Sequence, residues 1–577
     1  MALFNPNIKA AAEAAAKAAP TAPLPTASAS SDSFMNALSR ALSTDVVVAP
    51  PGMVRPYMAH QAAAHVACNA AITNHGCAFL GDDMGMGKTQ VLQALAAERV
   101  ANGGYAIMIA PPVALTGYRM DCAAAFPSLR LAQVKGRTAD FASLPEADLY
   151  FISDDTLTLK AWLTHEHVEM RNGAKHKVLT ATAFATGAKF LSRDEIHRDK
   201  GAQGRPTTPT SRSAIMLALG AALRERSIPI VAATGTLTVN KAVDAVVPLQ
   251  TIGGTKLLAE ITRSNAATAF LYRYCKPEKI WNGHKTITSF STDYSKLGEL
   301  HERLRDTVYV RREKSDLGDI LPNGAWLLRP FALNGAMRRY DAIARDVLKV
   351  IQEENGPAAY MRAARAEKLR EVMMLWEEAG KAKIGAAAEY IEDLVDQGRK
   401  VVAFYWHDSI RDGLSNKLSK AHIKYTVIAG KVTGDAREHA IRAFQDGAEQ
   451  VVLAQIQASG MAVTLTASAD AVFVQVPWSG GVLKQCADRI LRVDDRTLAR
   501  ARNGETVTWH VLQSCYDDGS PTIDSRLWEV LQQRCHAIDA INAGRPITMS
   551  DENVTLAVLE AWYADAQARY GSQLGRP

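Results

Sequence analysis

The 577-residue sequence contains no apolar run that reaches the ~18 residues needed to cross a bilayer. Its first residues lack the compact apolar centre and cleavage pattern of a secretory signal. Cysteine is scarce and scattered, with no Cys-x-x-Cys pair, which argues against a disulfide framework or a zinc site. The seven cysteines are Cys68, Cys77, Cys122, Cys275, Cys486, Cys515 and Cys535. These absences predict reduced thiols in a cytoplasmic protein with no membrane partner.

Neither sign of charge dominates, because 66 Lys and Arg against 60 Asp and Glu give a net charge of +6. This mild excess permits a polyanionic partner without requiring one. Basic side chains gather around residues 303–314 and 362–370, but acidic residues are interleaved in both, so salt-bridged helix faces explain them equally well. Residues 165–169, His-Glu-His-Val-Glu, miss the His-Glu-x-x-His metal spacing and are interpreted as a solvated segment.

Two regions of the chain alternate apolar runs with helical stretches. The apolar runs are residues 78–80, 105–110, 149–153, 189–192 and 228–233, then 401–405, 424–428, 451–454, 471–476 and 506–512. This rhythm predicts two doubly wound parallel sheets, whose ligands lie beyond the carboxyl ends of the strands. The expected domains are a disordered Ala/Pro/Ser-rich tail over 1–45, α/β regions over 46–254 and 386–545, a helical insert over 255–385 and a C-terminal helix over 546–577.

The most informative segment is residues 81–89, Gly-Asp-Asp-Met-Gly-Met-Gly-Lys-Thr, between an apolar strand and a helix. Glycines let backbone N–H groups surround a phosphate, and a helix N-terminus adds partial positive charge. Lys88 would reach the β- and γ-phosphates, and Thr89 would ligate Mg²⁺. Asp82 stands where the plain pattern has its first glycine. We therefore predict a nucleotide site, with a glycine-rich surface turn as the alternative; its candidate residues are Asp83, Met84, Gly85, Met86, Gly87, Lys88 and Thr89.

An acidic motif, Asp194-Glu195-Ile196-His197, follows its own strand about 105 residues later. Asp194 at the strand end can hold the Mg²⁺ shell, and Glu195 can orient and deprotonate the water that attacks the γ-phosphate. His197 can sense that phosphate. Such a match is often a surface polar cluster, but its position behind a strand and after the nucleotide loop favours catalysis.

Two further motifs extend this site. Small hydroxyl residues in Thr234-Gly235-Thr236, after another strand, can link the phosphate site to the second lobe, although an ordinary turn fits as well. In the second α/β region, Gln485, Arg489 and Arg492 are spaced i, i+4 and i+7, which predicts one helical face. Two arginines there can stabilise transition-state charge, whereas alone they would form a solvated face.

With these motifs in this order, the chain resembles a superfamily-two helicase-like ATPase of the Swi/Snf type from about residue 54 to 535. Other matching segments are Arg55-Pro56-Tyr57 with Gln61, residues 109–112 with Tyr118 and Asp121, Thr234-Gly235-Thr236 with Asn240, residues 311–314 with Leu321-Pro322, and residues 458–466. Departures from the family pattern are Leu237, Met461-Ala462, Leu491 and Val493-Asp494-Asp495.

The sequence of the nucleotide loop is most similar to that of the annealing-helicase branch, and the chain resembles a minimal motor of the bacterial or viral type. The resemblance implies two RecA-like lobes that use ATP and Mg²⁺, with Gln61 reading adenine and with Gln485, Arg489 and Arg492 completing the catalytic site. It implies a monomeric, DNA-stimulated ATPase that translocates on double-stranded or forked DNA without sequence preference and remodels or reanneals it. The protein would be cytoplasmic, associated with the nucleoid or, if it is viral, in the cytoplasm of the host cell. The alternatives are a strand-separating DNA or RNA helicase and a non-catalytic DNA-binding scaffold.

Overall fold

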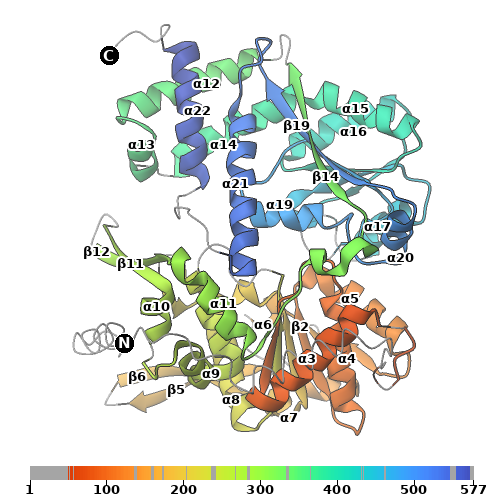
Figure 1. Cartoon of the computed structure of the whole chain (residues 1–577), viewed down its shortest axis with the longest axis vertical. Coiled ribbons are helices and arrows are strands. Elements are labelled where there is room, and N and C mark those ends of the chain that lie inside the picture. Colours follow the sequence, from red (N-terminus) through yellow and green to blue (C-terminus); the bar gives the residue numbers. More distant parts are fainter. Residues whose placement is uncertain are drawn as a thin grey trace. The chain divides into compact units, whose positions relative to one another are not determined.

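The structure is a computed structural model of the chain (Figure 1). It describes residues 50, 52–55, 57–134, 140–157, 162–171, 174–202, 205–235, 242–266, 268–281, 286–332, 337–363, 366–430, 432, 435–459, 463–545 and 554–571. These residues divide into two compact units. Unit 1 comprises the described residues of Met1–Leu317 and Ile538–Asp551, and unit 2 those of Gly318–Ala537 and Glu552–Pro577.

Seven parallel strands form the sheet of unit 1, in the order β13-β1-β10-β7-β2-β4-β3. Their bounds are β1 Cys77–Leu80, β2 Ala106–Ala110, β3 Leu131–Gln133, β4 Leu149–Ser153, β7 Phe190–Asp194, β10 Ile230–Ala233 and β13 Tyr309–Val310. The central strands are buried along their whole length, as parallel strands covered on both faces must be. The order makes β1, β10 and β7 neighbours, and each of them is followed by a predicted motif.

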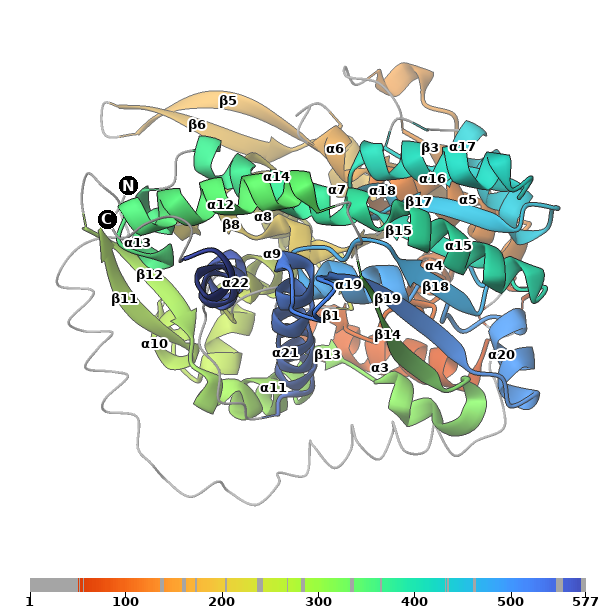
Figure 2. The ribbon, with the colours of Figure 1, turned by 90° about the horizontal axis from the view of Figure 1, so that it is seen from above.

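Helices and three antiparallel hairpins complete unit 1. The helices are α3 Ala59–His75, α4 Lys88–Val100, α5 Pro112–Ala125, α6 Asp154–Leu157, α7 Ala183–Gly187, α8 Ser211–Glu225, α9 Val246–Thr262, α10 Ala269–Tyr274 and α11 Leu297–Arg305. Short 3₁₀ turns are η1 Phe141–Ser143, η2 Ile196–Asp199, η3 Ala242–Ala245, η4 Tyr294–Lys296 and η5 Lys314–Ile320, which crosses into unit 2. The hairpins pair β5 Thr164–Arg171 with β6 Ala174–Ala181, β8 Gly201–Ala202 with β9 Arg205–Pro209, and β11 Cys275–Trp281 with β12 Thr286–Thr292. Figure 2 shows the β5–β6 pair as a long two-stranded ribbon.

The sheet of unit 2 is also parallel, in the order β14-β19-β18-β15-β17-β16. Its strands are β14 Gly324–Ala332, β15 Val401–Tyr405, β16 Tyr425–Ile428, β17 Val451–Gln455, β18 Asp470–Phe473 and β19 Val507–Cys515. Figure 1 shows β14 and β19 side by side, although about 180 residues separate them; Gly324 pairs with Val507 at one end and Ala332 with Cys515 at the other.

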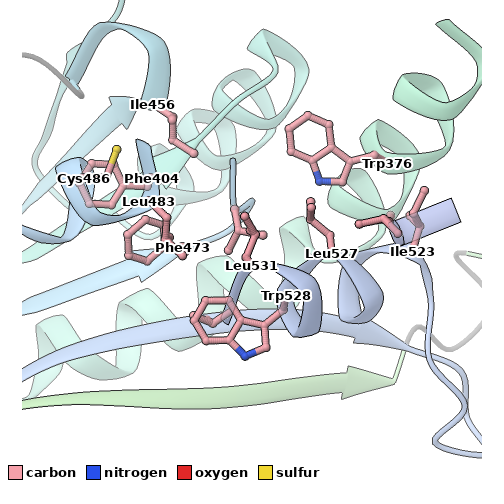
Figure 3. Close-up of a cluster of buried hydrophobic side chains, with 14 of the residues drawn as sticks. Trp376, Phe404, Ile456, Phe473, Leu483, Cys486, Ile523, Leu527, Trp528 and Leu531 are labelled. Carbon is pink, nitrogen blue, oxygen red and sulfur yellow. The ribbon is translucent and has the colours of Figure 1, made fainter. Parts of the chain in front are cut away.

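Helices cover this second sheet or pack on one another. They are α12 Arg338–Glu353, α13 Pro357–Ala363, α14 Ala366–Ala382, α15 Ile384–Asp396, α16 Asp408–Lys420, α17 Asp435–Gln445, α18 Ile456–Ser459, α19 Gly480–Ala487, α20 Asp495–Arg502, α21 Ile523–Ala543 and α22 Val554–Tyr570. The part of α21 from Ile538 on belongs to unit 1. Figure 3 shows part of the core: Ile523, Leu527 and Leu531, one helical turn apart on α21, lie among side chains of the sheet and of α14 and α19. Burying such a row removes a large apolar area from water, which stabilises the unit.

The predicted architecture of two doubly wound parallel sheets, as in RecA-like lobes, is confirmed. Residues 255–385, predicted as a helical insert, contain helices but also strands β11 to β14, which periodicity did not indicate. The predicted tail over residues 1–45 lies outside the described residues. Among the helices that the structure describes, none combines the length and apolarity that a bilayer crossing requires.

Candidate active site

The loop between β1 and α4 has the backbone geometry that its glycines predict. Gly85 and Gly87 both have a φ of 82°, in the left-handed region that glycine adopts without strain. A Cβ on Gly87 would stand 2.2 Å from the Nε2 atom of Gln61, so the loop lies directly against this α3 residue. Gly87 also caps α4, whose first N–H groups have no partner within the helix and can face an anion.

Lys88 and His60 donate to the backbone of the same loop. The Lys88 Nζ atom lies 2.8 Å from the carbonyl oxygen of Asp82 and 3.0 Å from that of Asp83. The buried His60 Nε2 atom is 2.9 Å from the carbonyl oxygen of Met86. An ammonium group, left-handed glycines and a helix N-terminus thus meet in one turn, which suits a phosphate.

Both aspartates of the loop have arginine partners far along the chain. The backbone N–H and the Nε of Arg312 donate to Asp82 Oδ1 at 2.9 and 3.2 Å, and its Nη2 donates to Asp82 Oδ2. Arg311 Nη2 donates to Asp83 Oδ1 at 2.8 Å. Asp82 can replace the first glycine because this pairing compensates its buried charge. The sequence motif at residues 311–314 gave no indication of where these side chains would bind.

The acidic motif begins at the end of β7. Asp194 is buried, its Oδ2 accepts a hydrogen bond from the Tyr118 hydroxyl of α5, and its Oδ1 accepts from the Glu195 N–H at 2.9 Å. Burial, and then the neighbouring Glu195 carboxylate, raise the pKa of Asp194 to about 6. Burial also raises the pKa of Tyr118 well above its usual value, so this hydroxyl stays protonated and donates. Glu195 has a φ of 54°, a left-handed conformation that is uncommon for a side chain with a Cβ and recurs at functional sites.

The acidic motif and the strand-end motif after β10 are joined by their side chains. His197 Nδ1 lies 2.8 Å from Thr234 Oγ1 and 3.1 Å from Glu195 Oε2, and Thr234 Oγ1 donates to Glu195 Oε2 at 3.3 Å. Thr234 therefore joins these two motifs within unit 1, whereas the predicted link from the phosphate site to the second lobe stays a prediction. Residues 236–240, which carry Asn240, lie outside the described residues.

A buried ion-pair network supports the acidic motif from behind. Arg193 is fully buried on β7, and its guanidinium donates to both carboxylate oxygens of Asp199 at 2.7 Å and to Asp154 at 3.2 Å. Its Nη1 donates to the carbonyl oxygen of Asp194. Arg198 is a second partner of Asp154, at 2.8 Å. Arg193 thus fixes the backbone from which Asp194 and Glu195 project.

The residues predicted to hold Mg²⁺ fit that ion chemically. Tyr118 contacts the Asp194 carboxylate and interacts with the Thr89 hydroxyl, so the two predicted ligands meet around one phenol. A hydroxyl and a carboxylate are the hard oxygen ligands that Mg²⁺ takes when waters and substrate phosphates complete its octahedron.

We expect Tyr118→Phe to weaken Mg²⁺ binding, because Asp194 loses the donor that orients it. Changing the outer partner of a metal ligand typically costs about 10–100-fold in metal affinity or activity. The measurement is the affinity for a nucleotide analogue titrated at several Mg²⁺ concentrations, with hydrolysis followed separately. Unchanged Mg²⁺ dependence in a folded variant would show that Tyr118 does not orient this carboxylate.

The second predicted cluster lies entirely in unit 2. The prediction that Gln485, Arg489 and Arg492 share one helical face is wrong, because α19 ends at Ala487. The Arg489 carbonyl accepts from the Leu465 N–H at 2.9 Å, which takes it out of the helical pattern. Arg492 Nη1 donates to Thr464 Oγ1 at 3.0 Å, so both arginines lie against the same loop.

A third arginine, which the sequence did not indicate, approaches this loop. Arg437 of α17 is buried and donates to the carbonyl oxygen of Ala458. Burial, and then the charge of Arg489, lower the pKa of Arg437. Arg437, Arg489 and Arg492 therefore gather positive charge around the motif at residues 458–466, of which residues 460–462 lie outside the described residues. Gln485 is half-buried on α19.

Comparison with known proteins gives a family match and several relatives. The helicase conserved C-terminal domain family matches residues 383–494. The chain is 27% identical over 254 residues to the mouse DNA annealing helicase and endonuclease ZRANB3, a stretch that covers 44% of this chain and 22% of that protein. It is 24% identical over 479 residues to the SWI/SNF-related matrix-associated actin-dependent regulator of chromatin subfamily A-like protein 1 of Xenopus laevis, covering 81% of this chain and 42% of that one.

The chain thus spans less than half the length of these curated relatives. Among solved structures, the Sulfolobus solfataricus SWI2/SNF2 ATPase core in complex with dsDNA aligns over 86% of this chain and 96% of its own, at 15% identity and a TM-score of 0.35.

Proposed function

We propose that this chain, a relative of the annealing-helicase branch of the Swi/Snf-type helicase-like ATPases, hydrolyses ATP and uses the energy to translocate on DNA. The track would be double-stranded or forked DNA, and the outcome remodelling or reannealing of strands. ATP with Mg²⁺ would be the cofactor pair.

One observation carries the proposal: three motifs converge where adjacent parallel strands end. Lys88 follows β1, Thr234 follows β10, and Asp194 ends β7, with Glu195 next to it. Thr234 and His197 contact the Glu195 carboxylate directly. Ligands of doubly wound sheets bind beyond the carboxyl ends of the strands, and this position of the glycine-rich loop and the two carboxylates supports the proposal.

Each side chain has a defined task in this proposal. Lys88 and the N-terminus of α4 bind the β- and γ-phosphates, and Gln61 lies against the loop where it can read the base. Thr89 and Asp194 would hold Mg²⁺, which would supply positive charge against the negative charge of the phosphates.

Glu195 accepts the proton of the attacking water, while His197 and Thr234 fix its carboxylate. Arg489 and Arg492, with Gln485, are the unit 2 residues assigned to the transition-state charge.

DNA is the proposed track because both relatives above carry names that describe action on DNA or chromatin, and because the chain carries a net positive charge. A translocase must accept any sequence, so its contacts should be to phosphates and not to base edges. For such binding, the logarithm of the association constant falls linearly with the logarithm of the salt concentration.

The test is steady-state ATP hydrolysis by the purified chain, alone and with duplex, forked and single-stranded DNA or with RNA. We expect duplex or forked DNA to raise turnover several-fold, the stimulation to fade with added salt, and Lys88→Ala to abolish hydrolysis with every nucleic acid. Preferential stimulation by RNA would indicate the strand-separating alternative. Absence of hydrolysis with all of them would indicate a scaffold and refute the proposal.

A further inference from the structure

Three consecutive residues at the start of the nucleotide loop are held by one short segment, residues 309–314. A Cβ on Gly81 would stand 2.2 Å from the Tyr309 ring, so only glycine fits beneath that ring. The side chains of Asp82 and Asp83 pair with Arg312 and Arg311. Backbone bonds continue the link, because the Gly81 N–H donates to Val310 and the Asp83 N–H to Arg312.

Arg311 is the centre of this arrangement. Its side chain is 3% exposed, and its guanidinium donates to the Gly81 carbonyl at 2.6 Å, to Asp83 Oδ1 at 2.8 Å and to the Gly235 carbonyl at 3.3 Å. Gly235 follows Thr234, the residue that contacts Glu195. One side chain therefore joins the nucleotide loop to the motif that contacts the acidic pair. The planar guanidinium group has several N–H donors in fixed directions, so it can bind these three acceptors at once. A lysine ammonium has no such geometry.

The aspartates that bind the arginines through their carboxylates also bind Lys88 through their carbonyls. Lys88 Nζ lies 2.8 Å from the Asp82 carbonyl and 3.0 Å from the Asp83 carbonyl. A phosphate that engages Lys88 competes with both carbonyls for the same ammonium. If a phosphate draws Lys88 away from these carbonyls, the backbone at Asp82 and Asp83 is affected, and Arg312 and Arg311 bind these same two residues.

Residues 309–314, which contact Asp82 and Asp83, are followed within a few residues by the end of unit 1. Arg311 and Arg312 stand a few residues before Leu317, the last residue of unit 1 before the chain enters unit 2 at Gly318. Lys314, which begins η5, donates its N–H to Asp83 Oδ2 at 3.1 Å, so the start of this connection is itself bonded to the loop.

We propose that Arg311 is a positioning residue that couples nucleotide occupancy of the loop to the chain connection at residues 309–320. The inference rests on the proposed function, since it takes the loop to bind a nucleotide. A static ion pair would only stabilise unit 1, whereas a coupling residue must also change the response of the connection to nucleotide.

The experiment measures two quantities on the full chain: the affinity for a non-hydrolysable ATP analogue with Mg²⁺, and hydrogen exchange of peptides covering residues 309–320 with and without that analogue. We expect the analogue to change exchange at 309–320 in the wild type. Arg311→Lys should remove this change and weaken analogue binding about tenfold, the order of one hydrogen bond to a charged group.

Asp83→Asn removes the partner and leaves Arg311 in place, so it tests the same pair if Arg311→Lys does not fold. Combining the two substitutions should weaken binding by less than the sum of the two separate losses, because both break the Arg311–Asp83 pair. Arg226→Gln is the matched control, since it removes an exposed positive charge from unit 1 at the end of α8. It should leave both quantities unchanged.

The coupling would be overturned if the losses of analogue affinity were additive in the double variant. It would also be overturned if the analogue did not change hydrogen exchange at residues 309–320 in the wild type. A wild type that binds the analogue and shows the response, but is not stimulated by DNA, would support the coupling and refute the proposed motor. A wild type that does not bind the analogue would overturn both.

Discussion

In Glu195→Gln we expect ATP hydrolysis to fall by about 10³-fold, within the range that a positioned general base contributes. ATP affinity should stay near that of the wild type, because the phosphate contacts come from the loop and α4. Glutamine has the same shape and can still accept the Thr234 hydrogen bond, so the left-handed backbone at position 195 is kept. The side chain loses its negative charge and with it the ability to take a proton.

The measurement is single-turnover hydrolysis beside equilibrium binding of ATP, with DNA present in both. Glu225→Gln, an exposed carboxylate at the end of α8, is the control and should hydrolyse ATP like the wild type. Hydrolysis at the wild-type rate in Glu195→Gln would remove this residue from the role of base. Loss of ATP binding together with hydrolysis would assign it to binding instead.

Arg193→Met should destabilise unit 1 by about 3–5 kcal/mol, the usual cost of leaving buried charge without its partner. The substitution keeps an unbranched apolar stem and removes the guanidinium that Asp154 and Asp199 share. Both carboxylates are fully buried, so water cannot replace the lost donors. Thermal unfolding followed by circular dichroism measures the loss.

The loss should depend on pH in a defined direction. Burial already raises the pKa of Asp154, and removing Arg193 takes away its largest opposing influence. A carboxyl group whose folded pKa lies above the unfolded value adds stability below the unfolded pKa and loses it as the pH rises through the folded one. The deficit of Arg193→Met relative to wild type should therefore be smaller at pH 5 than at pH 8.

Arg198→Met provides the comparison, because Arg198 pairs with the same Asp154 but is 24% exposed. Its destabilisation should be clearly smaller. Equal stability of Arg193→Met and wild type would show that the network does not support the acidic motif, and a deficit that grows toward pH 5 would contradict the assignment of Asp154.

The parallel core and the nucleotide loop could be predicted from sequence because their signals are local. Each predicted apolar run overlaps an observed strand, from β1 to β19, since buried parallel strands read as continuous apolar segments. Glycines 85 and 87 occupy left-handed conformations as a phosphate loop requires. β14 escaped prediction although Ala325 to Leu328 are apolar, because residues 255–385 were interpreted as helical; it is an edge strand whose side chains are mostly exposed.

Charge pairs across long sequence distances could not be predicted. Arg193 inside an apolar strand signals a buried counter-charge, but several aspartates could supply it, and only the fold selects Asp154 and Asp199. The same holds for Arg311 and Arg312, whose acidic neighbours in sequence were equally consistent with a salt-bridged helix face. The spacing of Gln485, Arg489 and Arg492 predicted one helical face, but α19 ends at Ala487. The Arg489 carbonyl instead accepts a hydrogen bond from the Leu465 N–H, a contact that local periodicity does not indicate.

The pairing of Asp82 with Arg312 also sets the order in which the protein can mature on the ribosome. The two residues are 230 positions apart. At about 5–20 residues per second, Asp82 emerges roughly 10–50 s before the arginine that neutralises it. Until then the two carboxylates of the loop lack Arg311 and Arg312, and β13, the edge strand beside β1, has not been made. A nascent chain should therefore acquire nucleotide affinity only late in synthesis, after residue 314 has left the exit tunnel.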